Sequence, residues 1–294
     1  MKNILLIVNP VSGKKTAVKN IDAIKSIFEE SGIKTTEYYT QKSKDAEETT
    51  IKRAGEFDTI VCVGGDGTLN EVISGMVKSG CSKPIGYIPS GTTNDFANTL
   101  GLSKDAIQAA RDILTGTQKE IDIGDMNGHL FSYIASFGAF TSCSHSTPQA
   151  LKNKLGHAAY LLGSVKDLFN IKPYRIKITA DGVSYDDEFM FGAICNSTSI
   201  GGLFKMDESM VDMSDGVFET VAAKMVHDPF SLLKRISEFK NRSYPSENIK
   251  FFKASEVTFE FDKKTAWALD GEFVQGDNKV TIKNLNKKIK LILK

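Results

Sequence analysis

The chain has 294 residues, with 37 basic and 36 acidic side chains and a formal net charge of +1 at pH 7. This length is typical of about two domains, and a hydrophobic fraction of 41% is enough to bury a core. The near-neutral charge gives no electrostatic indication that nucleic acid is a partner. The apolar run at residues 4–8 is far shorter than the ~20 residues that span a bilayer, and too short for a signal peptide, so we expect a cytoplasmic protein.

The cysteines are scattered along the chain, at Cys62, Cys81, Cys143 and Cys195. None belongs to a CxxC pair or to a His/Cys spacing typical of a metal site. We therefore expect reduced and mostly buried thiols.

Strand-like and helix-like patterns alternate in the first half of the chain. Apolar or β-branched runs predict strands at residues 3–8, 34–39, 58–63 and 84–88. Apolar residues at helical spacing predict helices from Val18 to about Gly32, at 43–55 and at 69–78. This alternation predicts a mostly parallel sheet with helices on both faces.

After about residue 120 the strand-like segments follow one another with few helices between them. Strands are predicted at residues 173–180, 184–196, 217–224, 249–261 and 279–293, and helices at 149–169 and 229–241. We therefore expect an α/β domain over residues 1–121 and a β-rich domain over 122–284, with the last strand, 285–294, able to return to the first domain.

Three loops that follow first-half strands carry the functional signal, because ligands of open α/β sheets bind at the carboxyl ends of the strands. In the first loop, NPVSGK at 9–14, Ser12 and Gly13 can turn backbone N–H groups toward a phosphate, and Lys14 adds a charge. A small turn that caps the following helix is the other interpretation of this loop.

The second loop, GGDGTLNE at 64–71, is more specific. Its glycines leave room for a phosphate against the backbone, and Asp66 can hold a metal-bound water or meet a cation. Thr68 and Glu71 also match the capping box of a helix, so both residues have a structural interpretation as well. The GxxxxGK[ST] spacing of a Walker A loop is absent.

The third loop is PSGTTNDFA at 89–97. Thr92 offers a hydroxyl and an N–H group, and Asn94 and Asp95 are expected to start a helix. Asp95 is interpreted either as a helix cap or as a second carboxylate that faces a phosphate site.

Together these loops closely resemble the diacylglycerol kinase catalytic domain, and in particular soluble lipid kinases of Gram-positive bacteria. The resemblance covers essentially the whole chain and extends to EIDIGDMNGHLF (120–131), TPQALKNKLGHAAYLLG (147–163), MVDMSDGVF (210–218) and ALDGEF (268–273). It implies an α/β nucleotide-binding domain like that of NAD kinases and phosphofructokinases, a β-sandwich-like second domain, and ATP in the cleft between them.

The resemblance also implies roles for individual residues. ATP would be contacted by Asn9, Pro10, Val11, Ser12, Gly13, Thr40, Gly64, Gly65, Asp66, Gly67, Thr68, Leu69, Asn70 and Thr92. Asp66, Asp95 and Asp122 would form an acidic network that holds the catalytic Mg²⁺, directly or through water. Glu272 would be the general base. Asp215 would bind a second, structural Mg²⁺ together with the carbonyl groups of Asp212 and Val217.

Phosphoryl transfer fits these roles, because it requires a positioned and neutralised γ-phosphate and a carboxylate that accepts the hydroxyl proton. The residues alone leave other interpretations open. Asp270-Gly271 is a strong hairpin signal, and Ser214-Asp215-Gly216 is an ordinary turn sequence.

The resemblance implies that the acceptor is a membrane lipid, diacylglycerol or a sphingoid or ceramide-type alcohol. From Lys279 onward the chain has six lysines and no acidic residue, which indicates either contact with an anionic membrane or strands with one solvated face. The helix near 148–169 and Lys14 are further candidates for membrane contact. Ala139 and Phe140 stand where many relatives have an acidic residue, a difference that bears on the choice of lipid.

Two other functions share part of this pattern. An NAD kinase would also have the GGDGT loop, but the PSGT-x-ND segment and the NPVSG turn suit lipid kinases better. A nucleotide-binding sensor without catalysis is the second, although Asp66, Asp215 and Glu272 are all present. The relatives also suggest a homodimer.

Overall fold

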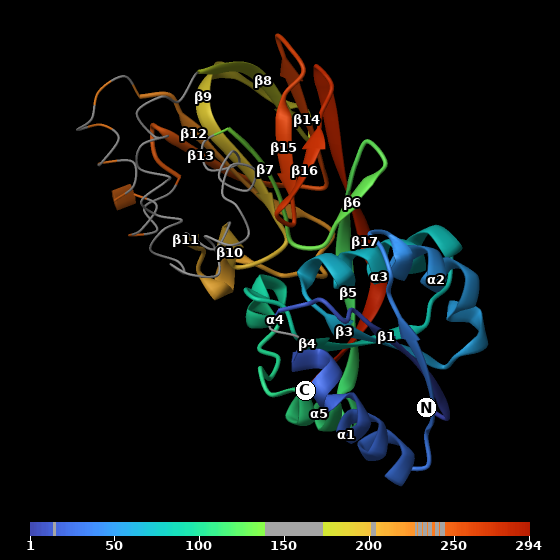
Figure 1. Cartoon of the computed structure of the whole chain (residues 1–294). Coiled ribbons are helices and arrows are strands. Elements are labelled where there is room, and N and C mark those ends of the chain that lie inside the picture. The colour runs from blue at the N-terminus through green and yellow to red at the C-terminus, as the bar shows by residue number, and fades with distance from the viewer. Residues whose placement is uncertain are drawn as a thin grey trace. The chain divides into compact units, whose positions relative to one another are not determined.

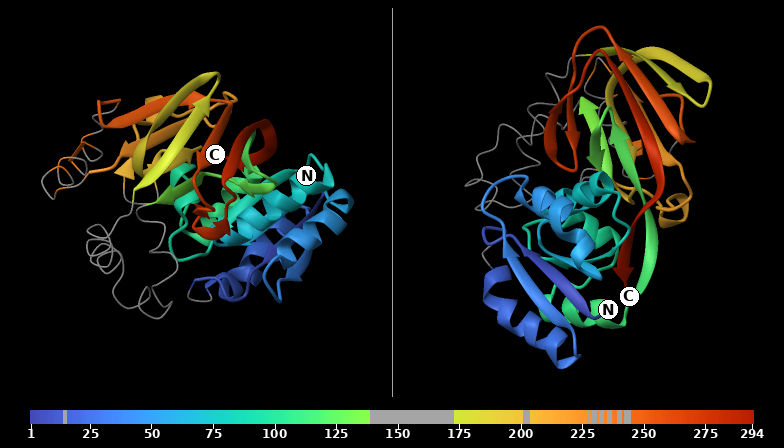
Figure 2. Two further views of the ribbon diagram at one scale, coloured as in Figure 1. Left: turned by 90° about the horizontal axis from the view of Figure 1, so that it is seen from above. Right: turned by 90° about the vertical axis from the view of Figure 1, so that its right-hand side faces the viewer.

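The computed structural model describes residues 1–13, 16–138, 173–200, 204–226, 228, 231, 234, 237–238, 241 and 245–294. It divides into two compact units. The first, called the α/β unit here, comprises Met1–Ile123 and Leu285–Lys294, and the second, called the β unit, comprises Gly124–Asn284. Both chain ends therefore belong to the α/β unit, which contains the blue N-terminal strands and the red end of the last strand (Figure 2).

The α/β unit is built on parallel strands that pair in the order β17-β4-β3-β1-β2 (Figure 1). Their bounds are β1 Asn3–Val8, β2 Lys34–Tyr39, β3 Thr59–Gly64, β4 Pro84–Pro89 and β17 Lys279–Leu293. β17 reaches this sheet with its last residues, which place Lys290 beside Pro84 and Leu291 beside Ile85. Strands β1 and β3 are almost continuously apolar because the sheet is covered on both faces.

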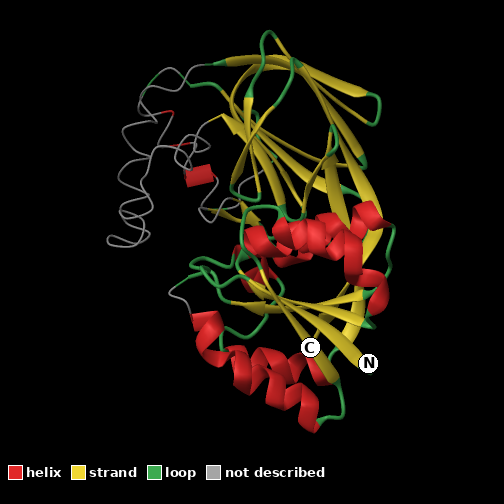
Figure 3. Ribbon diagram, turned by 45° about the vertical axis from the view of Figure 1, so that its right-hand side comes forward, coloured by secondary structure: helices red, strands yellow, loops and turns green. Residues whose placement is uncertain are grey.

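Helices cover both faces of this sheet, as Figure 3 shows in red. They are α1 Thr16–Glu30, α2 Asp45–Arg53, the 3₁₀ turn η1 Ala54–Glu56, α3 Asp66–Ser79, α4 Asp95–Thr99 and α5 Ala106–Thr115. On one face, Phe28 of α1 and Ile113 of α5 pack against Ile4, Leu6 and Val61. The predicted parallel sheet with helices on both faces is confirmed.

Two sequence predictions about helices in this unit need adjustment. α3 begins at Asp66, directly after Gly65, and not near Leu69. Of the loop's glycines, only Gly67 lies in the first helical turn. α4 begins at Asp95, which confirms that Asn94 and Asp95 start a helix. α5 was not predicted, although Ala106, Ala109, Ala110 and Ile113 are apolar at helical spacing.

The β unit is a largely antiparallel sheet in the order β16-β15-β7-β9-β8-β14-β17, with β12 between β9 and β13. The bounds are β5 Thr117–Met126, which enters from the α/β unit, β6 His129–Phe131, β7 Ile134–Gly138, β8 Tyr174–Ala180, β9 Val183–Cys195, β10 Ser199–Ile200, β11 Phe204–Lys205, η2 Glu208–Met210, β12 Phe218–Lys224, β13 Ile249–Ala254, β14 Glu256–Phe261, β15 Ala266–Leu269 and β16 Glu272–Gln275.

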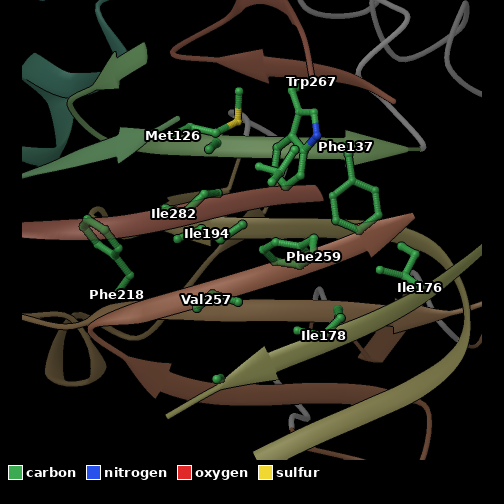
Figure 4. Packing of buried hydrophobic residues seen from close by; sticks show 14 of the residues in the cluster. Met126, Phe137, Ile176, Ile178, Ile194, Phe218, Val257, Phe259, Trp267 and Ile282 are labelled. Carbon is green, nitrogen blue, oxygen red and sulfur yellow. The ribbon is translucent and has the colours of Figure 1, made fainter. Parts of the chain in front are cut away.

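Aromatic side chains fill the core of the β unit (Figure 4). The ring of Phe137 lies 5.6 Å from that of Phe259, 5.1 Å from that of Phe261 and 5.0 Å from that of Trp267. Such pairs add about 0.5–1.5 kcal/mol each beyond the burial of apolar area. β7 and β15 both contribute to this cluster, so the strands that lead to the β15–β16 hairpin are anchored in the core.

The β-rich second half is confirmed, with one correction. The predicted strand 249–261 is two strands, β13 and β14, which separate at Ser255 and pair with different neighbours. The predicted helix 149–169 and most of the predicted helix 229–241 lie outside the described residues, as does Cys143. Cys62 and Cys195 are buried free thiols, and Cys81 is a partly exposed one. Among the helices that the model describes, none is both long and apolar enough to cross a membrane.

Candidate active site

The loops that follow β1, β3 and β4 meet at the carboxyl edge of the α/β sheet. Because these strands are adjacent and parallel, their loops are neighbours, and backbone hydrogen bonds join them: Asn9 N donates to Val63 O at 2.9 Å, and Ser90 N to Gly64 O at 2.8 Å. The Asn9 amide also donates to the Thr68 hydroxyl at 2.8 Å. The three predicted loops therefore form one site.

Glycines allow these loops to touch. Gly13 has a φ of +54°, and a Cβ atom there would lie 2.3 Å from the Ser90 carbonyl oxygen. A Cβ on Gly91 would lie 2.7 Å from the Cα of Gly65. The Ser12 hydroxyl, which is buried, donates to the Ser90 carbonyl oxygen at 3.0 Å. The backbone of each loop thus supports the next, which is the arrangement that backbone N–H groups need to cradle a phosphate.

Asp66 links two helices of this site. It is the first residue of α3, and its carboxylate accepts the N–H groups of Asp95 at 2.9 Å and Phe96 at 3.3 Å, which open α4. Burial raises the pKa of Asp66 to about 6, and the Asp95 carboxylate adds a smaller rise. The N–H bonds from Asp95 and Phe96 oppose this change, because they lower the pKa. The hydroxyl of Tyr87, a residue that sequence reasoning missed, lies 3.5 Å away.

These residues fit a divalent cation. A buried carboxylate beside a second carboxylate is costly to ionise, and a cation relieves that cost. Carboxylate oxygens are also the ligands that Mg²⁺ prefers. The chemistry of Asp66 and Asp95 thus fits Mg²⁺ near a phosphate, and their role as its ligands stays a prediction.

Asp122 has a different environment. It is fully buried on β5, and its carboxylate accepts the Lys287 N–H at 2.6 Å and the Asn286 side-chain amide at 3.2 Å. Lys287 has a φ of 49°, a left-handed conformation that is unfavourable for lysine. Asp122 therefore stabilises a bend in β17. Its part in a network with Asp66 and Asp95 stays a prediction.

The predicted capping box of α3 is wrong. The N-cap residue is Gly65, so Thr68 already lies inside the helix. Glu71 instead reaches α2: its carboxylate accepts the N–H groups of Lys44 at 2.8 Å and Ala46 at 3.1 Å. Glu71 thus caps a neighbouring helix, because the register of α3 directs it there.

Asp95 is not a helix cap either. Asn94 is the N-cap residue of α4, and its side chain accepts the Gly91 N–H at 2.9 Å and donates to the Gly91 carbonyl at 3.0 Å. Asp95 is the first residue of the helix, which leaves the interpretation as a carboxylate of the phosphate site.

The other predicted nucleotide contacts lie at the same edge of the sheet. Thr40 follows β2, and its N–H donates to the Val8 carbonyl at 2.9 Å. Val11 and Thr92 are exposed on their loops, whereas the side chains of Thr68 and Leu69 are buried. Nucleotide contacts from all the residues predicted for them, Pro10, Gly67 and Asn70 included, remain predictions, and Lys14 lies outside the described residues.

Glu272 and the predicted second metal site belong to the β unit. Glu272 is the exposed first residue of β16. The Asp215 carboxylate accepts the Val217 N–H at 3.1 Å and lies 3.6 Å from the Lys253 ammonium, which also pairs with the buried Glu219 at 2.9 Å. Asp212 accepts the Ser214 N–H at 3.0 Å. Within the described ranges, no group of three or more His, Cys, Asp or Glu side chains could hold a metal, so this site also remains a prediction.

The loops of the α/β unit are arranged in a way that suits phosphate binding, and the second unit is β-sandwich-like. This combination is typical of one class of nucleotide-binding proteins. Comparisons with known proteins agree. The model of the diacylglycerol kinase catalytic domain matches residues 3–126, and that of the YegS C-terminal NAD kinase beta sandwich-like domain matches residues 136–293.

Individual relatives cover most of the chain. It is 32% identical over 275 residues to a diacylglycerol kinase of Bacillus subtilis strain 168, which covers 93% of this chain and 90% of the relative. It is 30% identical over 281 residues to a diacylglycerol kinase of Staphylococcus carnosus strain TM300, with 92% and 89% covered.

A solved structure agrees with the fold. The crystal structure of a Bacillus anthracis protein assigned to the diacylglycerol kinases superposes with a TM-score of 0.84 at 25% identity, over 100% of this chain and 95% of the other. The chain belongs to the diacylglycerol kinase family, and it is a kinase of the lipid kinase class.

Proposed function

We propose that the protein transfers the γ-phosphate of ATP, with Mg²⁺, to the hydroxyl group of diacylglycerol, which gives phosphatidic acid. The observation that carries this proposal is the joined loop cluster of the α/β unit, in which the partly buried Asp66 carboxylate accepts the Asp95 N–H. The names of the relatives support diacylglycerol as the acceptor.

In the proposed reaction, the loops bind the phosphates through backbone N–H groups. Mg²⁺ would supply charge neutralisation at the phosphate oxygens, and Asp66 and Asp95 are the residues that would hold it. The acceptor oxygen bonds to the γ-phosphorus as the bond from that phosphorus to the β,γ-bridging oxygen breaks, so ADP leaves. Glu272 accepts the proton of the hydroxyl group, a role worth about 10²–10⁴-fold in rate.

Access to a lipid from the membrane surface belongs to the same proposal. The lysines of β17 alternate with buried residues. Lys283 pairs with Glu256 at 3.2 Å, and Lys294, which directly follows the strand, pairs with Asp112 at 3.3 Å. This pattern favours strands with one solvated face for β17. Peripheral contact with an anionic membrane and a homodimer remain predictions, and Ala139, Phe140 and the helix near 148–169 lie outside the described residues.

Transfer of labelled γ-phosphate to a panel of acceptors tests the proposal. The panel contains diacylglycerol in mixed micelles, a sphingoid base, ceramide and NAD, each with Mg²⁺ and with a chelator in its place. We expect Mg²⁺-dependent label in diacylglycerol. Label in NAD alone would contradict the proposal in favour of an NAD kinase, and label in no acceptor would favour a nucleotide-binding sensor.

A further inference from the structure

A buried aspartate lies two residues before the proposed general base. β15 and β16 form a hairpin in which Leu269 pairs with Glu272, so Asp270 and Gly271 are its two turn residues (Figure 1). Their φ angles of 48° and 84° are both left-handed, as a tight hairpin turn requires. Asp270 is only 6% exposed although it occupies the tip of a hairpin.

The Asp270 carboxylate is held by the backbone of another strand. It accepts the N–H groups of Ser132 at 2.6 Å, Tyr133 at 3.0 Å and Ile134 at 3.0 Å. The Asp270 N–H in turn donates to the Ile134 carbonyl at 2.9 Å. These bonds join the tip of the hairpin to the start of β7.

The segment that supplies these N–H groups is itself held from its other side. Asn196, at the end of β9, donates its N–H to the Tyr133 carbonyl at 2.9 Å and its side-chain amide to the Ser132 carbonyl at 3.2 Å. Both Ser132 and Asn196 are buried. Asp270 therefore attaches the hairpin to a rigid part of the β unit.

A second hairpin shows that an Asp-Gly turn forms without such a carboxylate. Asp181 and Gly182 join β8 to β9, where Ala180 pairs with Val183. Their φ angles, 44° and 85°, are nearly those of Asp270 and Gly271. The Asp181 side chain is exposed. The burial and the N–H bonds of Asp270 thus go beyond what the turn conformation requires.

We propose that Asp270 is a positioning residue that fixes the direction of Glu272, an inference that rests on the proposed role of Glu272 as general base. β16 lies at the edge of the sheet and pairs with β15, and Glu272 is exposed at its first position. A displacement of the base by about 1 Å can cost about 10²-fold in rate.

The test compares Asp270→Asn with Asp181→Asn in the full chain. Asparagine accepts left-handed backbone conformations, so both variants keep their turns. In Asp270→Asn, an NH₂ group replaces one carboxylate oxygen. This NH₂ group then faces a backbone N–H of residues 132–134, so two donors meet and a hydrogen bond is lost. We expect kcat at saturating ATP and diacylglycerol to fall about 10- to 100-fold, with KM for ATP within twofold of the wild-type value. Asp181→Asn should keep both constants.

A second variant, Asp270→Ser, removes the charge and leaves a hydroxyl that can accept an N–H bond, and it serves if Asp270→Asn does not fold. It should show the same split between kcat and KM. Hydrogen exchange should also speed up at the β15–β16 amides in either variant, whereas that of the β8–β9 amides stays unchanged.

The outcomes separate this inference from the proposed function. A folded Asp270→Asn or Asp270→Ser with kcat within twofold of wild type would overturn the positioning role. An equal loss of kcat and of ATP affinity would overturn it too, because that indicates general disruption. Glu272→Gln is measured in parallel. If that variant stays active, Glu272 is not the base, and the proposed mechanism fails on its own account.

Discussion

Asp66 in the α/β unit and Asp270 in the β unit are both buried or partly buried carboxylates that accept backbone N–H groups from another element. Asp66 receives two of them and has Asp95 as an acidic neighbour, and its pKa is raised to about 6. Asp270 receives three, all from residues 132–134. At Asp66, burial raises the pKa by more than the N–H donors lower it, and the Asp95 carboxylate adds to the rise. The two carboxylates thus have similar N–H bonds in different surroundings: Asp66 stands beside a second carboxylate at the loop cluster, whereas Asp270 joins the tip of a hairpin to residues 132–134.

The largest expected effect is that of Asp66→Asn. The variant keeps one oxygen, which can accept the stronger of the two α4 N–H bonds, but removes the charge that would hold Mg²⁺, so we expect Mg²⁺-dependent activity to fall by about 10²-fold or more. Without Mg²⁺ its free energy of unfolding at pH 7 should rise, on the order of 2 kcal/mol, because a carboxylate with a raised pKa destabilises the folded state when ionised.

Initial rates over a range of Mg²⁺ concentrations and urea unfolding in a chelator measure the two effects. Asp270→Asn is the matched control, since its free energy of unfolding should fall instead. If both variants change stability in the same direction, the distinction between the two carboxylates is wrong.

Gly91→Ala tests the loops around Asp66 by forcing them apart. The added Cβ would lie 2.7 Å from the Gly65 Cα and 2.7 Å from the Asn94 side-chain oxygen, so the loops must separate. We expect KM for ATP to rise about tenfold and stability to fall by about 1–3 kcal/mol. Gly182→Ala in the β8–β9 turn is the control, because it adds backbone strain at a distant left-handed residue without touching the loops. An unchanged KM in Gly91→Ala would argue against nucleotide binding at the loop cluster.

The raised pKa of Asp66 also predicts a pH dependence. The folded-state pKa of about 6 lies above the ordinary value of 3.8 for an aspartate, so protonation of Asp66 favours the folded state. This contribution is fully present below about pH 4 and is lost as the pH rises through 6. The difference in unfolding free energy between Asp66→Asn and the wild type, measured in a chelator, should therefore grow from pH 4.5 to 6.5 and then level off. A difference that does not change with pH would mean that Asp66 titrates in its ordinary range.

Glu71→Ala gives the smallest of these effects and adds a third carboxylate to the comparison. It removes the acceptor of the Lys44 and Ala46 N–H groups, and we expect a loss of about 1 kcal/mol. Because Lys44 has a φ of 65° and follows the loop that begins at Thr40, KM for ATP should also rise, about two- to fivefold.

Asp58→Ala is its matched control. Asp58 accepts the N–H groups of Lys2 at 2.7 Å and Asn3 at 3.3 Å, at the start of β1 and thus at the opposite end of that strand from the loops. A rise in KM for ATP in Asp58→Ala as large as that in Glu71→Ala would show that the effect of Glu71 is one of general stability.

Much of the α/β unit could be predicted because its signals are local. A buried parallel strand is a continuous apolar run. The loops after β1 and β3 can be recognised because glycines follow such runs within a few residues. The adjacency of the three loops then follows from parallel pairing.

The roles of the carboxylates could not be predicted in the same way, since their partners are far away in the chain. The donors to Asp270 are 136 to 138 residues away, and those to Glu71 are 25 and 27 residues away on another helix. Glu71 was assigned to its own helix because Thr68 stands three residues before it, and only the start of α3 at Asp66 decides against that. The break at Ser255 between β13 and β14 was invisible for the same reason, because both halves of the segment are apolar and differ only in the strands they pair with.

The last strand, β17, belongs to both sheets, and this affects the order in which the protein folds during synthesis. β17 is a single strand whose early residues pair with β14 and whose final residues pair with β4 in the parallel sheet. During synthesis, β1 to β4 emerge from the ribosome long before residues 285–294. The edge of β4 therefore has no β17 to pair with while the whole β unit is synthesised. Nascent chains halted before residue 285 should therefore be more easily cleaved by proteases in the α/β unit than chains released in full. Vectorial synthesis thus makes the pairing of β17 with β4 a late event in the folding of the α/β unit.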